Sequence, residues 1–183
     1  MVIVGQGNVA LDCARLLAKP LASLEGTDLT AASLAQLAAS RVTDIHIIGR
    51  RGHVQAAFTI KELRELTRLP GVRVEVLPSE LAQGSTESSL EEVRTKRPLK
   101  RLTDLIAATA AAATSASEEQ QQEEEEEEQQ QEKIVHIRFL LTPVQVREGP
   151  GGRVCSVLFE KCRLTGPPHA QTSVPTGAGL MRL

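Results

Sequence analysis

The sequence is very poor in aromatic residues. Its 183 residues include no tryptophan and no tyrosine, and only three phenylalanines: Phe58, Phe139 and Phe159. Proteins that bind single-stranded nucleic acids rely on aromatic side chains on which the bases stack. This composition therefore argues against nucleic-acid binding. Because 41% of the residues are nevertheless apolar, we expect a core built from Val, Ile, Leu and Ala.

Long apolar runs and paired cysteines are also missing. No run approaches the roughly 20 apolar residues that a membrane-spanning helix needs, so no span is predicted. The start of the sequence, MVIVG, shows no basic leader, signal-peptide core or transit segment. The cysteines are odd in number and have no CxxC spacing, which indicates reduced thiols in a soluble, intracellular chain. We expect one of them, Cys13, to face the core from a helix.

Residues that commonly carry out catalysis or bind metals are not grouped. The four histidines are scattered without the spacing of a metal site. No nucleophile elbow or Ser-His-Asp arrangement is present. We therefore predict no catalytic side chain and no metal ligand.

The net charge of −2 conceals a strong asymmetry. Residues 118–132 read EEQQQEEEEEEQQQE and contain nine of the 23 acidic residues but no basic one. The rest of the chain has 14 acidic and 21 basic residues, a balance of +7. A basic surface attracts a phosphorylated cofactor, an acidic protein or a nucleic acid, although an ordinary solvated surface would have the same composition. The Glu/Gln run itself has nothing to bury, and we expect a disordered insertion there. An acidic segment that binds cations or a partner is the alternative.

Hydrophobic patterning predicts a parallel sheet. Short apolar runs typical of buried strands alternate with helical patterns in the order β-α-β-α-β, which favours a Rossmann-like fold with right-handed crossovers. The predicted strands are 2–4, 42–48 and 72–76, and the predicted helices are 8–19, 30–39 and 59–69. The last helix opens with capping-box spacing from Thr59 to Glu62.

The second half of the chain predicts a smaller antiparallel unit. After a polar stretch from 78 to 92 we expect a basic helix over about 100–113, followed by strands at 134–141, 144–147 and 154–164. The sequence Gly-Pro-Gly-Gly at 149–152 is typical of a hairpin turn. The predicted division is an α/β dinucleotide-binding core over 1–117, the insertion over 118–133, a β-meander over 134–177, and a divergent tail over 178–183.

A glycine turn follows the first predicted strand. Residues 5–10 read GQGNVA and fit the pattern G-x-G-x-x-A between a strand and a helix. Gly5 permits the tight turn, and Gly7 lets a pyrophosphate approach the backbone. The unpaired amides at Asn8 and Val9 then face the phosphate oxygens. We expect residues Gly5, Gln6, Gly7, Asn8 and Val9 to bind a dinucleotide.

The end of the second strand indicates which dinucleotide. NAD sites usually carry Asp or Glu there to bind the ribose 2′-hydroxyl, but this sequence has Arg50 and Arg51. Two guanidinium groups suit the 2′-phosphate of NADP. If the pair contributes roughly 3 kcal/mol, NADP would be preferred about 150-fold. A solvated basic turn is the alternative.

Three segments together resemble the NADP domain of the adrenodoxin reductase family. These are VGQGNVALD at 4–12, GRRG at 49–52 and AFTIKELRE at 57–65, and residues 97–98, 100–103 and 174–177 extend the match. The resemblance covers nearly the whole chain outside the Glu/Gln run. It implies that NADPH passes a hydride to a bound FAD, which then delivers electrons to an acidic [2Fe-2S] ferredoxin, and it implies a mitochondrial location.

The resemblance also assigns roles to individual residues. Glu62 would lie at the NADP site, where a carboxylate can contact ribose hydroxyls or orient an arginine; its capping-box position is the alternative. Arg64, Arg97 and Arg101 would contact the ferredoxin, in agreement with the basic balance. A solvated helix face remains the alternative for each arginine.

The sequence departs from the family in three respects. The family's FAD-binding glycine motif lies before the segment seen here, and the part that completes the FAD site lies after it. We therefore expect this chain alone to lack the FAD site and to be inactive. His53 replaces a proline that is usual after the Arg-Arg-Gly turn, which is expected to loosen that loop. The alternatives are a non-enzymatic NADP- or ferredoxin-binding module and a non-functional truncation product.

Overall fold

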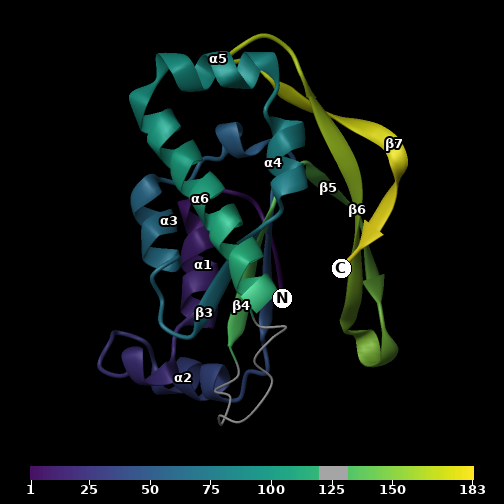
Figure 1. The fold of residues 1–183 in the computed structure, drawn as a ribbon. Coiled ribbons are helices and arrows are strands. Elements are labelled where there is room, and N and C mark those ends of the chain that lie inside the picture. The colour runs from purple at the N-terminus through teal and green to yellow at the C-terminus, as the bar shows by residue number, and fades with distance from the viewer. Residues whose placement is uncertain (120–131) are drawn as a thin grey trace.

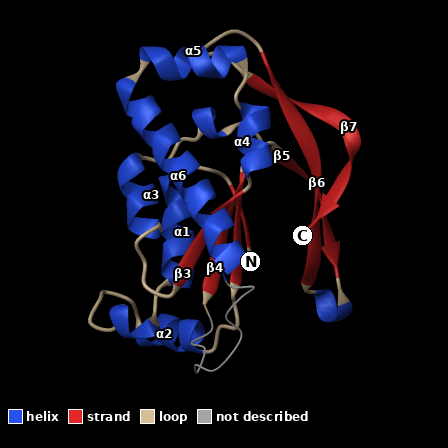
Figure 2. Ribbon diagram, viewed as in Figure 1, coloured by secondary structure: helices blue, strands red, loops and turns tan. Residues whose placement is uncertain are grey.

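A central parallel sheet separates a helical layer from an antiparallel sheet (Figures 1 and 2). The computed structural model describes residues 1–119 and 132–183, so the predicted insertion falls largely outside the described residues. The expected Rossmann-like sheet with an appended meander is confirmed. Within the described residues, no helix has the length and apolar character needed to cross a membrane.

The parallel sheet has the strand order β1-β2-β4-β3. Its strands are β1 (Val2–Val4), β2 (Asp44–Ile48), β4 (Lys133–Arg138) and β3 (Val72–Val76). The register pairs Ile3 with Ile47 and places Val135 opposite both Ile45 and Val74. These side chains point to one face, where the helices cover them. The sheet therefore places the carboxyl ends of β1 and β2 side by side.

The helical layer contains the elements that link the strands. Its main helices are α1 (Asn8–Ala18), α3 (Ile60–Leu66) and α6 (Arg97–Glu119), while α2 (Ala31–Ala38) lies at the lower end in Figure 1. Helix α1 buries the residues of one face: Ala10, Leu11, Ala14 and Ala18. The core is aliphatic apart from phenylalanines, as expected from the composition.

The prediction for Cys13 is wrong. Its side chain is exposed, as is that of Cys155, and only Cys162 is buried. The buried stripe of α1 runs through Leu11 rather than Cys13, because the helix is rotated toward Leu11 relative to the face that the sequence pattern suggested. Both positions flank Ala14 on a helical wheel, so the pattern alone did not separate them.

The polar stretch after β3 is helical rather than irregular. It forms α4 (Pro78–Gly84) and α5 (Glu87–Thr95). Proline occupies the first turn of α4, where its missing N–H costs nothing. Thr86 caps α5 by accepting a hydrogen bond from the amide of Ser89. These local signals were present in the sequence, but neither helix has a long apolar stripe.

The antiparallel sheet has the order β5-β6-β7. Its strands are β5 (Leu141–Glu148), β6 (Val154–Thr165) and β7 (Thr172–Arg182), and the predicted turn at 149–152 separates the first two. The meander is therefore shifted from its expected place: β4 joins the parallel sheet, and residues 178–182 belong to β7 instead of a separate tail. A second small core, built on Ile48, Leu141, Val157 and Phe159, joins the two sheets.

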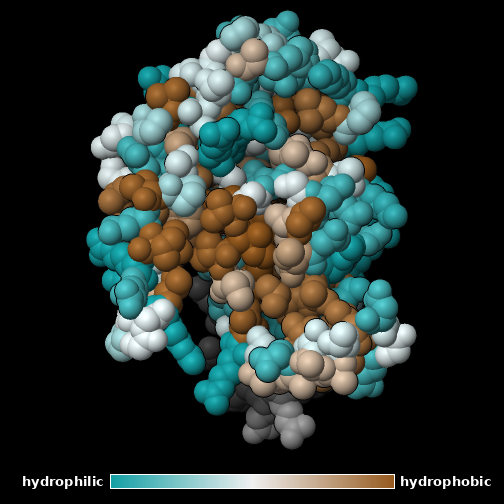
Figure 3. Space-filling view, turned by 180° about the vertical axis from the view of Figure 1, so that it is seen from behind, coloured by the Kyte–Doolittle hydropathy of each residue, from teal (hydrophilic) through white to brown (hydrophobic). Residues whose placement is uncertain are grey.

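The first strand lies at the edge of the parallel sheet. Among the described residues, β1 pairs only with β2. Val4 at its end is 59% exposed, and Val9 at the start of α1 is 75% exposed. Seen from behind, the molecule shows a broad apolar area across the middle of this side (Figure 3). Large exposed apolar areas are typical of surfaces that bind another protein, a membrane or a ligand.

Candidate dinucleotide site

The glycine turn joins β1 to α1 as expected. Gly5 has a φ of +135°, which side-chain-bearing residues rarely adopt, and its amide donates to the Ile48 carbonyl at 2.9 Å. Gly7 is the N-cap of α1 and provides no side-chain cap. Nothing lies within 4 Å of the position that a Cβ would take at Gly7. The first amides of α1 are thus open to an anion.

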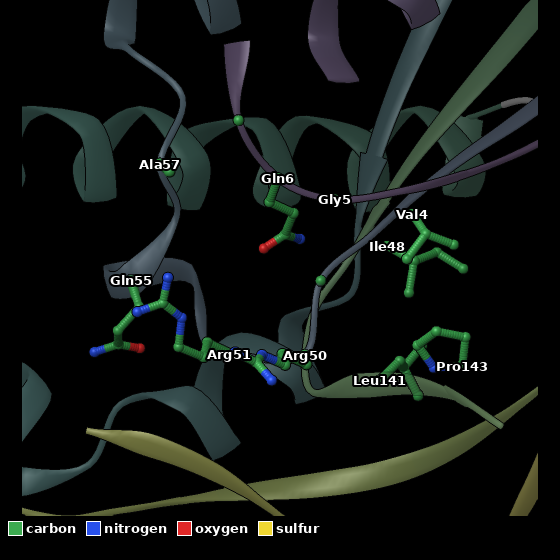
Figure 4. A pocket seen from close by; sticks show the side chains of 12 residues that line it. Val4, Gly5, Gln6, Ile48, Arg50, Arg51, Gln55, Ala57, Leu141 and Pro143 are labelled. Carbon is green, nitrogen blue, oxygen red and sulfur yellow. The ribbon is translucent and has the colours of Figure 1, made fainter. Parts of the chain in front are cut away.

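Arg50 and Arg51 lie at the same cavity as the glycine turn. This cavity, of about 290 Å³, is lined by both arginines and by Gly5, Gln6 and Gly7. Figure 4 shows the two arginines across the cavity from Gln6. Within the described chain, neither guanidinium has a hydrogen bond or ion pair to another residue, and both side chains are exposed. Both guanidinium groups are therefore available to a phosphate.

A single backbone carbonyl connects the glycine turn with the arginine loop, which begins at Gly49. The carbonyl of Arg138 accepts hydrogen bonds from the Gln6 side chain (2.7 Å) and from the Gly49 amide (3.0 Å). A Cβ at Gly49 would collide with the side chain of Gln6, so glycine is needed for this close approach. The Gln6 side chain is thereby held over the end of β2, and its backbone carbonyl accepts from the Ala57 amide at 2.9 Å.

The Arg138 side chain is itself anchored by a buried ion pair. Its Nε and Nη2 donate to Glu80 Oε1 at 2.9 and 2.7 Å, and Glu80 Oε2 accepts from the Phe139 amide at 2.7 Å. The side chains of Arg138 and Glu80 are only 14% and 10% exposed. The strand end that carries the shared carbonyl is therefore fastened to α4.

Two further elements contribute to the cavity without any signal in the sequence. Leu141 and Pro143 line it from β5, and Gln55 lines it from the short 3₁₀ turn His53–Gln55. Gln55 Nε2 donates to Gln171 Oε1 at 3.0 Å, which holds its side chain in place. The amides of Leu140 and Leu141 donate to the carbonyls of Arg51 and Gly49 at 3.1 and 3.0 Å. These long-range contacts shape the arginine loop.

Asn8 and Val9 occupy the first turn of α1, directly after Gly7. The side chain of Asn8 accepts a hydrogen bond from the Thr59 amide at 2.8 Å, so it is directed toward the start of α3. The backbone amides of Asn8 and Val9 remain the groups that would contact a diphosphate.

Glu62 lies in α3 and is not among the residues that line the cavity. Its carboxylate forms an ion pair with Arg15 at 3.1 Å, and Arg15 also contacts Asp12 and Glu65. The Glu62 amide donates to Thr59 Oγ1 at 3.4 Å, as the capping-box spacing predicted. The arginine that Glu62 contacts in this structure is Arg15.

His53 is buried beneath the loop that follows the arginines. Its side chain is 3% exposed and lies edge-on to Phe139, with 6.0 Å between the ring centroids. Burial lowers the pKa of His53 from 6.5 to about 4, because a charged imidazole is poorly solvated there. The histidine thus acts as a neutral packing residue beneath the site.

The three arginines expected to contact a ferredoxin are exposed on two neighbouring helices. Arg64 lies on α3, whereas Arg97 and Arg101 lie one turn apart at the start of α6. None of the three forms an ion pair within the described residues. The opposite side of α6 is buried through Leu102, Ile106 and Ala110, which leaves these cations directed to solvent.

Fold and site together define a Rossmann-type dinucleotide-binding region: a parallel sheet, a glycine turn before a helix and a cationic loop at the next strand. No family model matches the chain. It is 42% identical over 177 residues to human mitochondrial NADPH:adrenodoxin oxidoreductase, and 41% identical to the bovine enzyme. Each match covers 96% of this chain and 34% of the relative.

The structure is also similar to a solved bacterial reductase. FprA from Mycobacterium tuberculosis in complex with NADPH has a TM-score of 0.79 and 28% identity, covering all of this chain and 36% of that protein. The resemblance seen in the sequence is thus confirmed. The chain spans about a third of the length of the relatives it matches.

Proposed function

We propose that this chain is the NADPH-binding part of a flavoprotein reductase of the adrenodoxin type. The observation that carries the proposal is the single cavity shared by the glycine turn and two unpaired arginines. The diphosphate would lie at the start of α1, and the 2′-phosphate would be bound by Arg50 and Arg51. The similarity to a reductase solved with NADPH supports this assignment.

NADPH supplies a hydride, which in the longer protein would pass to FAD. The two electrons of that hydride would then leave the flavin one at a time to an acidic [2Fe-2S] ferredoxin, and the proton would be released to solvent. The chain's own residues would bind and orient the nucleotide, since the cofactors carry the redox chemistry and the protein positions them. We propose that the FAD site lies in parts of the longer protein outside this chain. The chain alone would then be inactive. A mitochondrial location is proposed from the names of the relatives.

The proposal is tested by titrating the purified chain with NADP and, separately, with NAD. We expect a preference for NADP of about 150-fold, corresponding to roughly 3 kcal/mol. The double variant Arg50→Ala/Arg51→Ala should lose most of this preference while retaining NAD binding. The matched control, Arg147→Ala/Arg153→Ala, removes two exposed arginines outside the cavity and should behave as the unmodified chain. Equal affinity of the unmodified chain for both nucleotides would defeat the proposal.

A further inference from the structure

Gln55 follows the arginine loop (Gly49–Gly52) and lines the dinucleotide cavity together with both arginines. Figure 4 shows its side chain on the same side of the cavity as that of Arg51. Within the described residues, the guanidinium groups of Arg50 and Arg51 have no hydrogen bond or ion pair of their own. The backbone of the loop therefore sets the position from which the two side chains extend, and whatever holds this backbone affects their reach.

Gln55 contacts the arginine loop through its backbone and its side chain. Its amide donates a hydrogen bond to the Gly52 carbonyl at 3.1 Å. Its side-chain oxygen Oε1 lies 3.1 Å from the position that a Cβ would take at Gly52, so the side chain fits closely against the loop. Gly52 is buried, and Arg51 directly precedes it. A displacement of Gln55 would thus shift the backbone that carries Arg51.

Hydrogen bonds to two elements distant in the sequence hold the Gln55 side chain. Its Nε2 donates to Gln171 Oε1 at 3.0 Å and to Ser89 Oγ at 3.3 Å. Ser89 Oγ also donates to Gln171 Oε1 at 2.6 Å, and Gln171 Nε2 donates to Thr86 Oγ1 at 2.7 Å. Ser89 is 0% exposed and Gln171 is 6% exposed. A reversed amide would place Gln55 Oε1 against Gln171 Oε1, two acceptors without a proton, so the network fixes its orientation.

Folding stability alone does not explain a glutamine at this position. Gln55 Oε1 is buried and has no hydrogen-bond partner within the described part of the chain. A buried amide oxygen without a donor destabilises a protein. A methionine of similar length would avoid this cost, and Gln171 Oε1 would keep the Ser89 hydroxyl as its donor. The glutamine therefore indicates a role in the cavity that it lines.

We propose that Gln55 is a positioning residue for recognition of the NADP 2′-phosphate and that Gln171 acts through it. Gln171 does not itself line the cavity. By holding Gln55, it would keep the arginine loop where Arg50 and Arg51 can reach the phosphate. Charge-assisted hydrogen bonds are strong only in a narrow range of distance and angle. The inference rests on the proposed function, because it requires that NADP binds in this cavity.

The test compares the binding of NADP and NAD to the full chain by calorimetric titration. Gln55→Met should weaken NADP about tenfold and change the affinity for NAD less than about twofold, because only NADP carries the 2′-phosphate. Gln171→Met should cause the same selective loss from outside the cavity. Gln36→Met is the matched control, because Gln36 is exposed on α2 and does not line the cavity.

A double-mutant cycle separates a positioning role from a general loosening of the fold. In the Arg50→Ala/Arg51→Ala background, Gln55→Met should change the affinity for NADP less than about twofold, because the groups through which it acts are absent. Circular dichroism verifies that each variant is folded. The affinity for NAD reports that the remainder of the cavity is intact.

Three results would overturn this inference and leave the assignment of the cavity in place. These are an undiminished affinity of Gln55→Met for NADP, an equal loss of affinity for NADP and NAD, and a tenfold effect that persists without the two arginines. Equal affinity of the unmodified chain for both nucleotides would instead contradict the proposed function, and this inference with it.

Discussion

Gln6 Nε2 donates a hydrogen bond of 2.7 Å to the carbonyl of Arg138, which is 132 positions further along the chain. The same carbonyl accepts from the Gly49 amide. One peptide group of β4 therefore fixes both the glycine turn and the start of the arginine loop. The two halves of the dinucleotide cavity are positioned by a strand that contributes no side chain to its lining.

Gly7 offers a way to separate nucleotide binding from folding. A methyl group at this position meets nothing within 4 Å and needs no unusual φ. Gly7→Ala is therefore expected to change the free energy of unfolding by less than about 1 kcal/mol. It should weaken NADP at least about tenfold, because the methyl group occupies the space into which the pyrophosphate approaches. Chemical denaturation and NADP titration give the two readouts; undiminished NADP affinity would contradict the placement of the diphosphate.

The ion pair between Glu80 and Arg138 should contribute to the stability of the fold because it is buried. Glu80→Ala leaves the Arg138 guanidinium largely buried without its partner, and the expected loss is about 3–5 kcal/mol of unfolding free energy. The exposed pair Lys100–Asp104, with side chains 61% and 59% exposed, is the comparison. Asp104→Ala should cost less than about 1 kcal/mol. Similar losses for both variants, measured by denaturant titration, would contradict this interpretation.

The stability of the fold should fall in mildly acidic solution. Burial lowers the pKa of His53 from 6.5 to about 4, and burial followed by repulsion from His136 lowers the pKa of His46 to about 4. The unfolded chain thus binds more protons than the folded chain below pH 6.5. The contribution of each histidine is fully present above pH 6.5 and is lost progressively down to about pH 4.

The slope approaches about 1.4 kcal/mol per pH unit for His53 when only the unfolded state protonates it, and it is smaller for His46, which is more exposed and therefore screened by solvent. The pKa of Asp44 is lowered mainly by the hydrogen bond from Thr43. Asp44 therefore changes the stability only at lower pH, below its usual pKa of 3.8. His53→Leu should reduce the slope between pH 6.5 and 4. Denaturation curves over this range test the effect, and an unchanged slope in the variant would exclude His53 as a source.

Binding of an acidic ferredoxin should depend on the start of α6. Arg97→Glu/Arg101→Glu is expected to weaken the association at least about tenfold at low salt and to reduce its dependence on ionic strength. The charge-matched control, Arg147→Glu/Arg153→Glu, places the same change on the meander. Binding is measured by surface plasmon resonance at several salt concentrations. An equal effect of both double variants would indicate a response to net charge rather than a defined docking surface.

The sequence predicted those parts of the fold that depend on local signals. The glycine turn, the strands around it and the Thr59 cap follow from residue type and spacing over a few positions. The arginine loop was placed correctly beside the turn because adjacent parallel strands bring their carboxyl ends to one edge. The binding roles of these residues remain predictions.

Other parts depend on contacts that no short pattern contains. Leu141 reaches the cavity from a strand almost a hundred positions after Gly49. Gln55 is held at the cavity by a hydrogen bond to Gln171, which is 116 positions further along the chain. The sequence of β4 indicates a strand but not its position in the fold, and β4 lies between β2 and β3 in the parallel sheet. The prediction for Cys13 was wrong for a local reason: α1 is rotated about its axis so that Leu11, and not Cys13, faces the core.

The hydrogen bonds from Leu140 and Leu141 to Arg51 and Gly49 provide an internal reporter of ligand occupancy. Their amide protons become open to solvent only when the arginine loop separates from the meander. A nucleotide that holds the loop closed would slow deuterium uptake at these two amides. Mass spectrometry of peptides from this segment would thus detect occupancy without any change in absorbance or activity.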